Sequence, residues 1–171
     1  MSEPTGPRDE PAPASHPRNG AEGAEPAAPG APAPSHFSPP DGAAGDEQLA
    51  EIAHFVFDLA RSGDDERLAA YLDGGVPVDL TDASGNTLVM LAAYNGQPST
   101  VRLLTGRGAD VNRLNDRGQS PLAGAVFKAE PEIVRTLLAA GADPTAGSPN
   151  ALDTARMFEQ TDLINLLEGT E

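Results

Sequence analysis

Residues 87–112 read TLVMLAAYNGQPSTVRLLTGRGADVN, and this stretch decides the fold. Thr87 can cap a helix whose apolar residues recur at helical spacing, and Gly96 supplies the left-handed turn that ends it. Pro98 stands where the first turn of a second helix tolerates proline, and Gly108 ends that second helix. The polar, turn-rich residues that follow should project as a hairpin-like finger. The stretch therefore predicts a helix-turn-helix unit followed by a finger.

The unit recurs along the chain at a fixed period of about 33 residues, which is typical of repeat architectures. Gly75, Gly108 and Gly141 each end an apolar helical stretch and follow one another at this period, as do Gly63 and Gly96. A unit that cannot bury its apolar face alone must stack on copies of itself. The sequence therefore predicts an all-α solenoid of about four units with β-hairpin-like fingers. The predicted units are 50–81, 82–114, 115–147 and 148–168, and the last follows at a slightly shorter interval than the others.

The first 47 residues have a different composition from the rest of the chain. They contain 11 of the 17 prolines, and their 8 acids and 2 arginines give a charge of −6. Such a segment cannot bury enough apolar surface to offset the entropy of ordering it. We expect residues 1–47 to be a disordered tail and residues 48–171 to be the folded domain. The tail could be a docking segment, although a purely solubilising role is the simpler interpretation.

Composition also limits the partners of the chain. The 26 acids exceed the 11 bases by 15, and this balance argues against nucleic acid as a partner. No cysteine is present, which excludes disulfides, thiolate catalysis and Cys-ligated zinc. No apolar run approaches the roughly 20 residues that span a bilayer, and the amino terminus lacks the apolar core of a secretory signal. We therefore expect a soluble, cytoplasmic protein that has no membrane partner.

The repeats resemble those of the ankyrin repeat family, in its small bacterial forms. The resemblance rests on residues 87–112 and on Gly118–Pro144, where the motifs GQSPL, IVR, LL and GADP recur in order. The two middle units match well, and the outer two are degenerate, as terminal capping units usually are. The turns Thr87–Met90 and Ser120–Ala123 lack the histidine that normally joins adjacent turns in this family. We expect those turns to be less rigid than in consensus repeats.

The residues that usually perform catalysis are sparse. Of the three histidines, His16 and His36 fall in the tail and His54 at the edge of the first unit. No serine or threonine of the repeats has a histidine partner, and no cluster of ligands has metal-binding spacing. The sequence therefore predicts no enzyme activity, cofactor or metal, and a hydrolase is the least favoured alternative. The resemblance instead implies a monomeric protein that binds another protein as an adaptor, regulator or stabiliser.

The resemblance also implies a partner site on the concave face, which finger tips and first helices form. Tyr94 and Phe127 occupy equivalent positions one period apart, and Met157, followed by Phe158, continues them at the shortened offset. Their side chains could form an exposed apolar strip or could fill gaps between adjacent helices. An alternative function is an effector-like or immunity-like inhibitor that occludes a partner enzyme, with the acidic surface suited to a basic target. The predicted binding residues are Arg61, Asn86, Tyr94, Asn95, Arg117, Gln119, Phe127, Lys128 and Met157.

Overall fold

The computed structural model describes residues 43–169, which form eight α-helices. Within this range, β pairing is limited to an isolated antiparallel bridge between Thr81 and Thr87, at the base of the first finger. The predicted all-α class with hairpin-like fingers is confirmed. The helices are α1 Ala43–Ser62, α2 Asp65–Asp73, α3 Leu88–Tyr94, α4 Pro98–Gly106, α5 Pro121–Phe127, α6 Pro131–Ala139, α7 Ala151–Met157 and α8 Thr161–Glu168.

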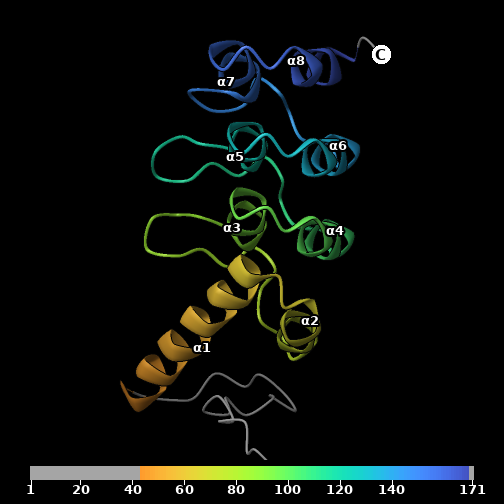
Figure 1. The fold of residues 1–171 in the computed structure, drawn as a ribbon. Helices are drawn as coiled ribbons and strands as arrows, with labels where there is room; N and C mark the ends of the chain where they lie inside the picture. The colour runs from red at the N-terminus through yellow and green to blue at the C-terminus, as the bar shows by residue number, and fades with distance from the viewer. Residues whose placement is uncertain (1–42, 170–171) are drawn as a thin grey trace, which may run out of the picture. The chain divides into compact units, whose positions relative to one another are not determined.

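The helices stack in two rows (Figure 1). Helices α3, α5 and α7 pack one on the next in the first row, and α4, α6 and α8 do so in the second. Helix α1 packs on α3 and helix α2 on α4, so these two helices begin the stack. The fingers are the connections between successive pairs, and they project beside the first row (Figure 1). The described residues thus form four stacked helix pairs, as a solenoid requires.

The helices of the first row begin at side-chain caps. Thr87 Oγ1 accepts a hydrogen bond from the Met90 amide at 3.3 Å, and Ser120 Oγ accepts one from the Ala123 amide at 3.1 Å. Asn150 caps α7 in the same way. In the second row, α4 and α6 begin with a proline, whose missing N–H would have no partner there. Local sequence therefore places both helices of the middle units.

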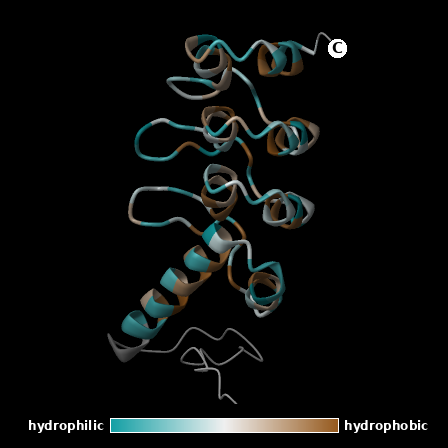
Figure 2. Cartoon of the chain, viewed as in Figure 1, coloured by the Kyte–Doolittle hydropathy of each residue, from teal (hydrophilic) through white to brown (hydrophobic). Residues whose placement is uncertain are grey.

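The core continues through the whole stack. Residues Leu88–Ala93 of α3 are all buried, which leaves Tyr94 as the exposed residue of that helix. The sequence suggested one apolar face, but α3 is covered by α1, α4 and α5 together and is therefore buried nearly all round. Figure 2 shows apolar residues concentrated in the helix rows and polar residues along the fingers. No helix among the described residues combines the length and apolar character needed to cross a membrane.

Helix α1 begins earlier than the predicted folded domain. It starts at Ala43, so residues 43–47, which the sequence assigned to the disordered tail, are helical. Asp46 in its first turn favours this, because a carboxylate is stabilising near the positive end of a helix. The expectations for residues 1–42 lie outside the described residues, and the other unit limits stay predictions.

Each helix pair is joined by a turn in the left-handed region of backbone conformation. Gly63 and Gly96 have φ values of 77° and 68° there, which explains why these two glycines recur at the repeat period. The third and fourth pairs carry Ala129 and Glu159 at the equivalent place, with φ values of 57° and 55°. The later turns therefore keep the conformation without the residue that adopts it most easily.

Candidate functional site

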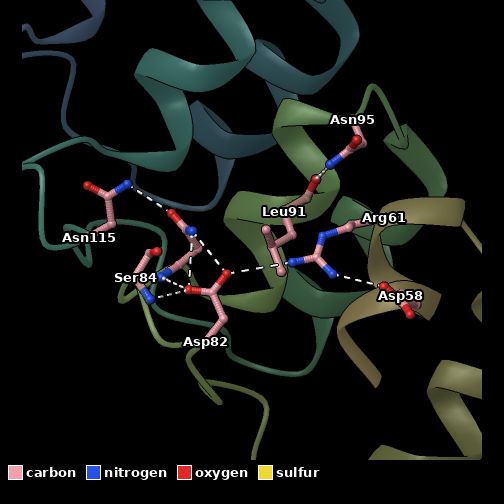
Figure 3. Close-up of polar contacts among 8 residues, drawn as sticks. Asp58, Arg61, Asp82, Ser84, Leu91, Asn95 and Asn115 are labelled. Carbon is pink, nitrogen blue, oxygen red and sulfur yellow. Dashed lines mark hydrogen bonds and ion pairs between the residues drawn. The ribbon is translucent and has the colours of Figure 1, made fainter. Parts of the chain in front are cut away.

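The first finger is organised around the carboxylate of Asp82 (Figure 3). Its Oδ1 accepts hydrogen bonds from the backbone amides of Ser84 at 2.9 Å and Asn86 at 3.0 Å, and the Asn86 side-chain amide donates to both oxygens. Burial alone would raise the pKa of Asp82. The bonds from Asn86 and Ser84, with the positive charge of Arg61, outweigh burial and hold that pKa below its usual value. Asp82 thus shapes the finger tip as an anion.

Asn115 plays the same part in the second finger, one repeat later. Its Oδ1 accepts from the amides of Arg117 at 3.0 Å and Gln119 at 2.9 Å. Its Nδ2 donates to Asn86 Oδ1 at 2.8 Å, and this bond joins the second finger to the first (Figure 3). A backbone bond from the amide of the next residue, Asp116, to the Ser84 carbonyl at 3.1 Å supports the same junction. The two finger tips are therefore held in register.

The bases of the fingers are joined by a bond that repeats with the units. Asp79 Oδ1 accepts from the Asp110 amide at 2.8 Å, and Asn112 Oδ1 accepts from the Asp143 amide at the same distance. Asn112 Nδ2 also donates to the carbonyl of Gly141. These bonds join adjacent units without the histidine that the turns lack.

Three aromatic rings form a row across successive units. Tyr94 stacks on Phe127 with ring centroids 5.9 Å apart and planes 4° from parallel. Phe127 meets Phe158 edge to face at 5.5 Å. The three side chains are 46%, 48% and 49% exposed, so they lie on the surface rather than in gaps between helices. Met157, expected in this row, is even more exposed, but Phe158 is the residue that continues the ring contacts.

The three rings line a groove, which we call the aromatic groove. It has a volume of about 410 Å³ and is lined by residues of three consecutive units. The finger residues supply most of its polar side chains, and none of the described residues that line it carries a carboxylate. Six of the nine predicted binding residues line it: Asn86, Tyr94, Arg117, Gln119, Phe127 and Met157.

The other three predicted residues lie outside the lining. Arg61 forms ion pairs with Asp58 at 2.9 Å and Asp82 at 3.6 Å. Asn95 donates through Nδ2 to a backbone carbonyl of its own helix at 2.7 Å (Figure 3). The Lys128 ammonium lies 5.2 Å from the centre of the Tyr94 ring and so stands beside the ring row. Arg61 and Asn95 therefore have structural partners, whereas Lys128 remains next to the groove.

Phe158, Pro149 and Met90 are not among the nine predicted binding residues, yet all three line the groove. Phe158 directly follows the repeat-equivalent position, and its sequence signal was the aromatic pair that it continues. Among the described residues, no group of three His, Asp or Glu side chains is placed to bind a metal ion.

A comparison with known protein families finds one that matches this chain. A family model described as ankyrin repeats (3 copies) matches residues 56–148, which is 93 of the 171 residues. The chain belongs to the ankyrin repeat family. Ankyrin repeats generally mediate interactions between proteins, and members of the family are typically non-catalytic. The fourth helix pair, α7 and α8, lies beyond the matched residues and is seen in the structure.

Relatives from bacteria and animals share parts of the chain. An ankyrin repeat protein of Pseudomonas aeruginosa is 45% identical over 58 residues, which is 34% of each chain. Ankyrin repeat domain-containing protein 29 of Danio rerio is 44% identical over 62 residues, which is 36% of this chain and 21% of the relative. The ankyrin repeat and SAM domain-containing protein 6 of Mus musculus is 40% identical over 78 residues, which is 46% of this chain and 8% of the relative. The matches thus span about a third or less of these relatives.

Proposed function

We propose that this ankyrin repeat protein is a non-catalytic interaction module whose aromatic groove holds a segment of a partner protein. In this function it acts as an adaptor, a regulator or a stabiliser of that partner. The observation that carries the proposal is the exposed ring row. The whole chain has only 7 Phe and Tyr residues, and Tyr94, Phe127 and Phe158 meet on one surface, each about half exposed. Exposed aromatic rings beside arginine are typical of interface hot spots.

The groove is also well prepared for binding. Ring-to-ring contacts restrict the aromatic side chains before a partner arrives, and this lowers the entropy lost on association. The hydrogen bonds of Asp82 and Asn115 hold the polar finger residues that line the groove. A lining that combines aromatic rings with polar finger side chains suits a peptide segment that both buries apolar side chains and forms hydrogen bonds.

The test is a pull-down with the full chain carrying Tyr94→Ala and Phe127→Ala. Removing interface rings typically costs about 2 kcal/mol or more, or roughly thirtyfold in Kd, so the partner should be lost. Leu114→Ala is the matched control, because Leu114 is 42% exposed but does not line the groove. Circular dichroism checks that both variants are folded. Retention of the same partner by the folded double variant would refute the proposal.

A second candidate function is inhibition of a partner enzyme by occlusion of its active site. The net charge of −15 favours it, since an acidic molecule is attracted to a basic target. A captured enzyme should then lose activity in proportion to the bound chain, and added salt should restore the activity. An adaptor would leave the activity of the partner intact.

The proposal also keeps the expectations of a monomeric protein that acts in the cytoplasm without nucleic acid or membrane partners. The excess of acids over bases supports the exclusion of nucleic acid. Light scattering on the purified full chain tests whether the protein is monomeric, and a mass equal to that of a dimer would contradict this expectation.

A further inference from the structure

The aromatic groove differs in charge from the molecule that carries it, and this difference points to a class of partner. We infer that the groove selects an acidic, apolar segment: an extended stretch of a partner protein that places an aromatic or branched aliphatic side chain beside Asp or Glu. The inference rests on the proposed function and deepens it, because it names what the groove recognises.

The first observation is the absence of acids from the groove. Residues 43–169 contain 19 Asp and Glu residues, yet none of these is among the residues that line this site, whereas Arg117 is. Asp82, the acid that shapes the first finger, has its charge directed toward Arg61 and Asn86. A segment with its own carboxylate therefore meets no acidic side chain on the groove walls.

The second observation is how the cations of the structure are used. Nine Arg and Lys side chains lie in residues 43–169, and five of them form ion pairs. Two of the other four are Arg117, which lines the groove, and Lys128, which stands over Tyr94. In this part of the chain, the remaining two, Arg113 and Arg135, are exposed and do not line the groove. The groove therefore has one cation in its lining, Arg117, and one beside it, Lys128, and neither forms an ion pair with a carboxylate of residues 43–169.

These features complement an acidic, apolar segment. An arginine without an ionic partner can bind a carboxylate through two parallel hydrogen bonds. This pairing strengthens when the bound segment excludes water from the aromatic rings nearby. The rings of Tyr94, Phe127 and Phe158 accept the neighbouring apolar side chain. Because three units line the groove, a segment lying along the row touches each of them in turn.

An acidic segment is the opposite of the basic target that the net charge of −15 favours. Charges on the rest of the surface act from a distance, and salt at physiological strength screens them beyond about 8 Å. Contacts inside the groove are made at hydrogen-bond range and lose little to screening. Overall acidity should therefore slow the approach of an acidic segment, while the groove still decides which segment stays bound.

The first experiment pans a display library of random peptides on the immobilised full chain and sequences the enriched clones. Peptides whose capture is lost with Tyr94→Ala and Phe127→Ala identify the groove binders. We expect these peptides to combine an aromatic or branched aliphatic residue with Asp or Glu. Groove binders that are neutral or basic would overturn the inference and leave the proposed function standing. If no captured peptide depends on the rings, both fail.

The second experiment measures the Kd of the most enriched peptide by fluorescence anisotropy. Arg117→Glu with Lys128→Glu should weaken binding roughly tenfold, since it replaces attraction by repulsion at two places. Arg113→Glu with Arg135→Glu is the matched control, because it changes net charge equally at exposed sites outside the groove. The control should bind within about twofold of the unaltered chain. Equal losses in the two double variants would show that overall charge, and not the groove, selects the peptide.

Discussion

At the scale of single residues, Asp82 carries the clearest prediction of pH dependence. Its pKa is lowered in the fold, so its contribution to stability is fully present above its unfolded pKa, about 3.9, and is lost as pH falls through the lower folded pKa. Asp82→Asn should remove this contribution, because the amide cannot titrate. Denaturant unfolding at several pH values should show the two proteins converging below about pH 4.

Asp82→Ala tests the same site by removing the acceptor. The amides of Ser84 and Asn86, which are exposed and partly buried, would then lose this partner, at a net cost of about 1 kcal/mol. Asp82→Asn is the matched control, because the natural Asn115 accepts the equivalent two bonds in the second finger. Equal stability of the Ala and Asn variants would mean that these bonds do not hold the finger.

The roles of some residues can be predicted from the sequence alone, and those of others cannot. Thr87 and Gly96 were predictable, because capping and left-handed turns depend on local chemistry. Arg61 and Phe158 were not: Arg61 is paired with acids of its own chain, and Phe158 takes the place in the ring row expected of Met157. Which neighbour a side chain contacts depends on packing between units, and repeat spacing carries no such information. Six groove residues were nevertheless found, because equivalent positions of stacked units share a face.

At the scale of an element, the turns between paired helices predict a stabilising substitution. Ala129 has φ 57° in the turn between α5 and α6. A residue with a Cβ is strained in this conformation by about 1 kcal/mol, whereas glycine is not. Ala129→Gly should relieve that strain, partly offset by the greater freedom of glycine in the unfolded chain. We expect a net gain of about 0.5 kcal/mol, measured by denaturant unfolding.

The equivalent turn between α3 and α4 carries glycine and therefore predicts the opposite effect of substitution. Gly96 has φ 68°, and an added Cβ would lie 3.1 Å from Glu130 Oε1. Gly96→Ala should therefore destabilise the protein by about 1 kcal/mol or more. If Ala129→Gly lowers stability instead, strain at this turn is not the controlling quantity.

At the scale of the whole molecule, stacked units predict that the place of a core defect decides how much of the chain it unfolds. Leu122 in α5 is fully buried between neighbours on both sides, whereas Leu163 lies in α8, the last described helix. Either truncation to Ala should cost about 2 to 5 kcal/mol. In a solenoid each unit is stabilised mainly by its neighbours, so a defect in the last described pair of this stack should open that pair alone. Hydrogen exchange should therefore speed up throughout the stack in Leu122→Ala but only in α7 and α8 in Leu163→Ala.

Because Phe158 and Pro149 lie in that last unit, Leu163→Ala should also weaken groove binding while α3 and Tyr94 stay folded. Uniform exchange in both variants would show instead that the four pairs unfold as a single cooperative unit.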